Sequence, residues 1–238
     1  MSASQTCHPL SISTCTLPFP SNFYTQNDSD SATGKTVDLK GSLLTQSVEN
    51  KISNFSSSSA YVNSSGFSAA APVMIELSDD FDENSLPIHG GNVVMVFNQD
   101  SGMAHPIRSQ KYHYAENNRF THNAHIIEIF PRSRFKFGQT YTAVITNNLL
   151  TLNREAFPAI PAMAALRDRT ASWEGAESMQ IALEQLQQFG ISSDQVVTFV
   201  EFTIADEKNN NEPLFDLINK VSQQEHPIRN LNTTQINI

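Results

Sequence analysis

Five short apolar runs, each bounded by turn-forming residues, constrain the fold of this chain more than any other feature of its sequence. Residues 139–147 (QTYTAVITN) alternate along the chain, which is the period-2 pattern of a β-strand with two different faces. Residues 195–204 (QVVTFVEFTI) carry apolar side chains on both faces, so we expect this run to lie centrally in a sheet. The same criteria predict strands over residues 72–77, 92–98 and 119–130.

The sequence also predicts three helices. Residues 161–169 begin with Pro, which suits the first turn of a helix, and continue with strong helix formers. Residues 173–189 have apolar side chains at helical spacing, with Ser172 as the expected N-cap and Gly190 as the expected stop. Residues 212–224 carry a third apolar stripe, formed by Leu214, Leu217, Ile218 and Val221.

Short strands at fairly regular spacing, without a helix between each pair, favour an antiparallel sandwich. We therefore predict a mainly β protein, an antiparallel β-sandwich with a helical insertion at about residues 158–190 and a C-terminal helix. The expected organisation is an extended N-terminal segment (1–33), the sandwich (34–205), and a C-terminal helix and linker (206–238).

Composition argues against two classes of function. Lys and Arg number 15 and Asp and Glu number 24, so the 238-residue chain has a formal net charge of −9. This sign argues against a general nucleic-acid binder, which needs a basic face to neutralise phosphates. The apolar runs fall well short of the roughly 18–20 residues that a membrane-spanning helix needs, and we expect no transmembrane segment.

The N-terminal region bears on the cellular compartment. It has neither the basic start nor the apolar stretch of a signal peptide, which taken literally indicates a cytosolic protein. The Ser- and Asn-rich composition is instead typical of a secreted protein whose signal has been removed, and we expect an extracellular or cell-surface location. Cys7 and Cys15, the only cysteines, could close a disulfide loop in an exported protein; two unrelated thiols are the alternative.

Several short motifs resemble one group of bacterial secreted proteins. They include LPFPSNFYT, TGKTVDL, SGFS, APVMIEL and FGQTYTAVITNNL, at residues 17–25, 33–39, 65–68, 71–77 and 137–149, with further likeness at 79–86 and 197–204. Taken together, they resemble the N-terminal domain of bacterial extracellular lipases of the virulence-factor type. In that family an Ig-like region precedes an α/β-hydrolase lipase domain, so the resemblance implies an Ig-like sandwich here.

The resemblance implies an accessory function without catalysis. An α/β-hydrolase carries its nucleophile in a G-x-S-x-G turn, and this sequence contains no such pentapeptide. We therefore expect no catalytic residue and no cofactor, and we expect the lipase domain to follow residue 238 as the partner in the same polypeptide. The implied function is to support or present that domain, with a lipid or cell-surface ligand as a further partner. The alternative is a free-standing cell-surface binding or adhesion protein.

An acidic turn offers a candidate calcium site. Asp80, Asp82 and Asn84 follow the spacing of the first ligands of a calcium-binding loop. Ser85 and Gly91 stand where that loop needs Gly and a bidentate Glu, so a turn between strands is the favoured interpretation.

Histidines offer two further candidates. His113 and His122 would meet across a hairpin and could share a metal, although exposed strand histidines are the favoured interpretation, also for His125. Asp100, Ser101 and His105 are close in sequence, but a catalytic triad is defined by geometry, and we expect none there.

A basic run offers a candidate interaction face. Arg132, Arg134 and Lys136 alternate with less polar residues, so on a strand they would form one cationic face. Such a face could contact an anionic partner, such as a lipid headgroup or an acidic domain. The favoured interpretation is a solvated outer face over a buried aromatic one.

Overall fold

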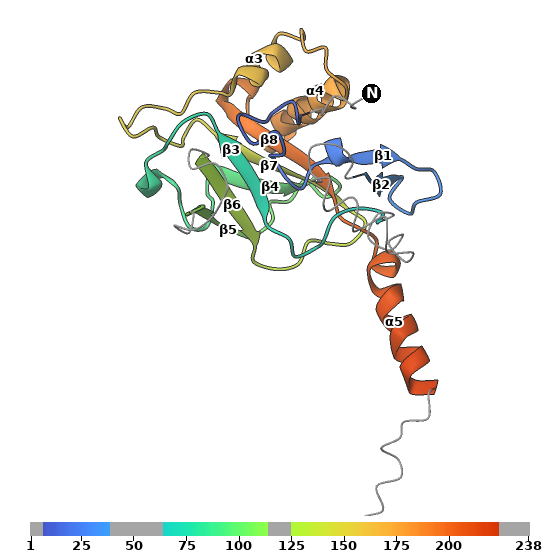
Figure 1. Ribbon diagram of the computed structural model, residues 1–238. Coiled ribbons are helices and arrows are strands. Elements are labelled where there is room, and N and C mark those ends of the chain that lie inside the picture. The colour runs from blue at the N-terminus through green and yellow to red at the C-terminus, as the bar shows by residue number, and fades with distance from the viewer. Residues whose placement is uncertain (1–6, 39–63, 114–124, 224–238) are drawn as a thin grey trace, which may run out of the picture.

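Three antiparallel sheets and three helices make up the described part of the chain, which is residues 7–38, 64–113 and 125–223 of a computed structural model (Figure 1). The first sheet has the order β3 (Val73–Leu77), β6 (His125–Pro131), β5 (Ile107–Lys111). The second has the order β4 (Val94–Asn98), β7 (Thr140–Thr146), β8 (Val196–Thr203). A two-stranded ribbon pairs β1 (Thr25–Asn27) with β2 (Lys35–Val37). The prediction of a mainly β, antiparallel protein is confirmed.

The two three-stranded sheets share one hydrophobic core. Val73 and Ile75 of β3 pair with Ile129 and Ile127 of β6, and all four side chains are fully buried. Because side chains alternate across a strand, this register places one apolar row of each strand on the same face. The second sheet completes this core with Tyr141, Ala143 and Ile145 of β7 and Val197, Val200 and Phe202 of β8. The arrangement is therefore sandwich-like.

A helical layer covers the other face of the second sheet (Figure 1). It consists of α3 (Pro161–Arg167), α4 (Ala176–Gln185) and the 3-10 turn η3 (Leu186–Phe189). Phe97, Val144 and Phe199 come from the sheet side of this contact, and Met163, Leu166, Leu183 and Leu186 come from the helices. The predicted helical insertion is thus present, and it serves as the third layer.

This layer corrects one prediction about the sheet. Residues 195–204 do not lie centrally, because β8 is the edge strand and β7 is the middle one. β8 is apolar on both faces because Val200 enters the sandwich core while Phe199 packs against the helices. Cover from a helical layer produces the same pattern as a central position in a sheet.

The second predicted helix begins later than expected. α4 starts at Ala176, and Ser172 does not cap it. Gly175 is the residue before the helix and has φ of +79°, a left-handed conformation that glycine adopts readily. Gly190 follows η3 with φ of +78°, which confirms the predicted C-terminal stop.

The N-terminal segment is paired with the rest of the fold. The 3-10 turn η1 (Asn22–Tyr24) leads into β1, whose partner β2 lies beyond the expected boundary at residue 33. The sequence analysis did not predict β1, β2 or β5, because each of these strands contains at most one apolar residue. The described part of the strand expected over 119–130 is β6, and residues 119–124 lie outside the described ranges.

The last described element, α5 (Glu207–Gln223), extends away from the three layers (Figure 1). It begins five residues before the predicted start at residue 212. None of the described helices is long and apolar enough to cross a membrane.

Gly66 packs closely against the backbone at the end of β8 and provides a test of the fold. A Cβ at this position would lie 2.6 Å from both the Ala205 nitrogen and the Thr203 oxygen. Because neither backbone atom can rotate away, we expect Gly66→Ala to lower the free energy of unfolding by about 2–4 kcal/mol. Chemical denaturation followed by circular dichroism measures this loss.

Gly34→Ala is the matched control. Gly34 has φ of +71°, but no described atom lies within 4 Å of its ideal Cβ position. Only the left-handed backbone then carries a cost, of about 1–2 kcal/mol. Equal losses for the two variants would contradict the close approach of residue 66 to the end of β8.

Candidate functional site

A groove of about 810 Å³ opens above the outer face of β8. Phe199 and Glu201 form its floor, η1 and the β1–β2 ribbon form one wall, and the start of α4 forms the other. The volume lies within the roughly 300–1,000 Å³ typical of small-molecule sites. The groove exists because the helical layer and the N-terminal segment each cover only part of this sheet face.

Glu201 is held in a fixed position at the base of the groove. The Asn22 side-chain amide donates to one carboxylate oxygen, and Gln99 Nε2 donates to the other at 2.9 Å. Gln99 Nε2 also donates to Thr142 Oγ1 at 2.7 Å, and Thr142 pairs with Glu201 across β7 and β8. The Oδ1 atom of Asn22 is buried and has no hydrogen-bond partner among the described residues. The base is therefore rich in hydrogen-bond acceptors.

The charged residues around the groove have mixed signs. Glu174 from the α4 side and Asp38 from the β2 side add negative charge to that of Glu201. Lys35 of β2 lines the same groove and adds a positive charge. Phe23 and Met179 contribute apolar surface on opposite walls. These side chains can form hydrogen bonds and apolar contacts with one bound molecule.

A buried Ser–His pair also lines the groove. His8 Nε2 lies 2.9 Å from Ser21 Oγ, and the two residues are 2% and 3% exposed. The backbone N–H of Leu10 donates to His8 Nδ1, so the proton of the neutral ring lies on Nε2 and is donated to Ser21. Burial lowers the pKa of His8 to about 3, which keeps the ring neutral.

This polarity is the reverse of that in a serine hydrolase. A catalytic His accepts the Ser proton, and its other nitrogen donates to an acid. His8 instead accepts from a backbone N–H at that other nitrogen. The pair therefore serves to fix residues 8–21 against the fold. Sequence analysis missed the pair because two residues thirteen apart form no motif.

The Cys7 and Cys15 sulfurs are joined in a disulfide, one of the two alternatives that the sequence left open. Within the loop they close, the N–H groups of Ile12, Ser13 and Thr14 donate to the carboxylate of Glu76 on β3. The hydroxyls of Ser11, Ser13 and Thr14 donate to the same carboxylate. Successive backbone N–H groups arranged in this way form an anion-binding nest. Glu76, only 2% exposed, thus attaches the N-terminal loop to the first sheet.

The basic run does not lie on a strand, which corrects the prediction. β6 ends at Pro131, before the basic run begins. The Phe135 N–H donates to the backbone oxygen of Ala69 at 2.9 Å, and not to a neighbouring strand of the sheet. Arg132, Arg134 and Lys136 are nevertheless exposed. Ser133 is also exposed, so only part of the expected alternation holds.

Arg108 extends the basic surface from β5. Its guanidinium lies 5.0 Å from the centre of the Phe130 ring, on the strand that leads into the basic run. The Arg132 N–H donates to Pro106 at 2.9 Å, which fixes the run beside the start of β5. Within the described residues, neither Arg108 nor the three cations of the run form an ion pair.

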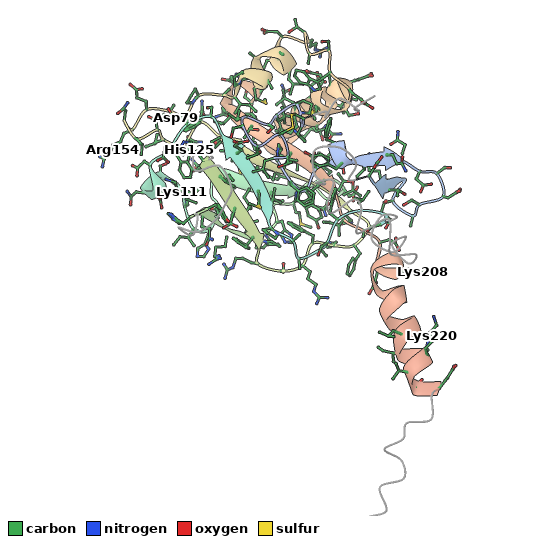
Figure 2. The ribbon with its side chains drawn as sticks, viewed as in Figure 1. Asp79, Lys111, His125, Arg154, Lys208 and Lys220 are labelled. Carbon is green, nitrogen blue, oxygen red and sulfur yellow. A yellow bond between two sulfur atoms is a disulfide. The ribbon has the colours of Figure 1, made fainter. Side chains whose placement is uncertain are left out.

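Asp80 of the candidate calcium turn forms an ion pair with Lys111. Lys111 Nζ lies 2.7 Å from Asp80 Oδ1 and 3.3 Å from Glu83 Oε1, and His125 Nδ1 lies 3.5 Å from Asp80 Oδ1. Figure 2 shows Lys111 and His125 on the same side of the molecule as Asp79. Burial works to raise the pKa of Asp80, but the hydrogen bonds and charge of Lys111 outweigh it and hold the pKa below its usual value. Asp82 caps a 3-10 turn by accepting from the Asn84 N–H and side-chain amide.

The other metal and triad candidates are placed as follows. His113 lies 3.5 Å from Glu83, and His122 lies outside the described residues. His105 Nε2 contacts the Ser133 oxygen at 2.9 Å, while Ser101 Oγ accepts from the Met103 N–H. The described residues contain no group of three or more His, Cys, Asp or Glu side chains placed to hold a metal ion.

No protein-family model matches the sequence, and no curated protein matches it.

Glu76 generates a pH-dependent prediction. Burial works to raise the pKa of Glu76, but the hydrogen bonds from Ser13 and Thr14 outweigh it and hold the pKa below its usual value. A carboxyl whose pKa is lower in the folded state stabilises the fold above its unfolded pKa of about 4.3. This stabilisation is lost as the pH falls through the folded pKa.

We expect Glu76→Gln to lower the free energy of unfolding by about 2–4 kcal/mol at pH 7, because the new amide group would face hydrogen-bond donors. Thermal melts from pH 7 to pH 3 should show a weaker pH dependence for this variant than for the unmodified protein. Glu128→Gln, on the neighbouring strand and bonded to Gln110, is the control, with an expected change within about 0.5 kcal/mol. Identical pH profiles for the unmodified protein and Glu76→Gln would contradict the role of the nest.

Proposed function

We propose that this chain is an exported Ig-like module without catalytic activity, which supports or presents the α/β-hydrolase domain of a secreted bacterial lipase or esterase. The exposed apolar face of α5 is the observation that carries this proposal. Leu217, Ile218 and Val221 are 58%, 51% and 43% exposed. Their spacing places them on one face of the helix.

Such a face is suited to contact with another folded domain. α5 leaves the three layers, so the sandwich core does not cover these side chains (Figure 1). Contiguous exposed apolar surface on a soluble domain often marks an interaction site. The disulfide further supports export, because such bonds persist mainly in oxidising compartments. The motifs that resemble lipase N-terminal domains suggest the identity of the partner domain.

Two measurements test the accessory function. The gene should continue beyond the codon for Ile238 into a region that encodes a G-x-S-x-G motif; a stop codon there would remove the proposed partner. The isolated chain should not hydrolyse p-nitrophenyl butyrate above background. Turnover that is abolished by Ser21→Ala or Ser101→Ala would overturn the non-catalytic assignment. We expect no turnover through Ser21, because His8 donates a proton to this serine instead of accepting one from it.

The basic run supports a second part of the proposal, that the module holds its partner domain near an anionic lipid surface. Each Lys or Arg close to such a surface contributes about 1 kcal/mol of attraction. Arg132, Arg134 and Lys136 with Arg108 would then contribute roughly 4 kcal/mol, opposed by the net charge of −9 on the whole chain.

Vesicle sedimentation measures this attraction. We expect the protein to pellet with phosphatidylglycerol vesicles at low salt, and not with phosphatidylcholine vesicles. The triple variant Arg132→Gln, Arg134→Gln, Lys136→Gln should lose at least tenfold in binding. Arg154→Gln, which removes an exposed cation from the segment between β7 and α3, is the control. Equal binding by the triple variant and the control would contradict the lipid-facing role.

A free-standing binding protein is the second candidate function. The groove over β8 favours it, because a ligand-sized groove with fixed polar side chains does not require a partner domain. A stop codon after Ile238 together with ligand binding in the groove would favour this candidate over the accessory module.

A further inference from the structure

We propose that the groove over β8 binds a neutral saccharide, through a subsite centred on Glu201. This inference is independent of the lipase-associated function, because it uses neither α5 nor the basic run. It rests on the hydrogen-bonding capacity of the base, the charges around the groove and the apolar side chains of its walls.

The base of the groove requires a ligand with several hydrogen-bond donors. A carboxylate has about four acceptor sites, and Glu201 uses one on each oxygen for Asn22 and Gln99. The remaining acceptor sites of Glu201 match a pair of adjacent hydroxyl groups, which can donate to both oxygens at once. The two amides fix the carboxylate before the ligand arrives, which reduces the entropy lost on binding.

The charges favour a neutral ligand. Glu201, Glu174 and Asp38 would repel an anion such as a phosphorylated or acidic sugar. Lys35 offsets part of this negative charge and so weakens the attraction for a cation, and it can donate to a hydroxyl oxygen of a neutral ligand. Sugar hydroxyls both donate and accept, so they suit this mixture of groups.

A purely apolar ligand suits the groove poorly. It would displace water from Glu201 without replacing the lost hydrogen bonds, which is costly for a charged group. The walls nevertheless include Phe23 and Met179, which are half-buried and can contact the C–H face of a sugar ring. Gln26, Asn27 and Ser178 lie exposed at the rim and can bond further hydroxyls.

Saturation-transfer NMR with the intact chain tests this site. The probes are maltose, cellobiose, lactose and N,N′-diacetylchitobiose, with glucose 6-phosphate and spermidine as anionic and cationic comparisons. We expect at least one neutral disaccharide to bind and both charged probes to fail. Isothermal titration calorimetry then gives the affinity for the disaccharide that binds.

Three variants locate the binding. Glu201→Gln should weaken binding at least tenfold, and Ser178→Trp should abolish it by filling the groove from the exposed side of α4. Glu128→Gln, on the outer face of the other sheet, should bind like the unmodified protein. Circular dichroism checks that each variant is folded; if Glu201→Gln does not fold, Ser178→Trp decides the result.

Three outcomes would overturn the proposal. One is that no disaccharide of the panel binds. Another is that spermidine or glucose 6-phosphate binds in the groove in preference to the neutral sugars. The third is that disaccharide binding is unchanged in folded Ser178→Trp and Glu201→Gln. None of these outcomes depends on whether a hydrolase domain follows this chain.

Discussion

The second sheet must be covered on both faces, and the rest of the structure depends on this constraint. β7 is buried along nearly its whole length, and β8 has inward Val200 next to outward Phe199. One face is covered by the first sheet. The other is divided between the helical layer and the N-terminal segment, because neither is large enough to cover it alone. The groove over Glu201 is the region that this division leaves open.

The wall of the groove is therefore only as rigid as the attachment of the N-terminal segment. Residues 7–15 are closed by the disulfide and bonded to Glu76, and His8 bonds back to Ser21, immediately before η1. Through this sequence of contacts, Asn22 is placed against Glu201. A carboxylate on the first sheet thus helps to position a side chain on the outer face of the second. Weakening the hydrogen bonds between residues 12–14 and Glu76 should therefore change the shape of the groove as well as the stability of the fold.

Sequence analysis predicted the elements that are rich in apolar residues. The strands β3, β4, β6, β7 and β8 and the helical insertion were predicted, because at least one face of each is mostly apolar. β8 was placed wrongly within its sheet, since an edge strand that is covered on both faces has the same apolar pattern as a central strand. The basic run was expected on a strand, but the backbone hydrogen bond from the Phe135 N–H to the Ala69 oxygen directs the chain away from the first sheet. Such a bond depends on tertiary contacts that a single sequence does not reveal.

The candidate site could not be predicted from sequence for a related reason. Asn22, Gln99, Thr142 and Glu201 form one hydrogen-bonded network, yet they are contributed by η1, the turn after β4, β7 and β8. The one local signal was Glu201, the single ionisable residue within the strand β8. A charged side chain on a strand that is apolar on both faces must either reach solvent or be held by polar partners. Glu201 does both, because it opens into the groove while two amides hold it, and this is the combination that a binding site requires.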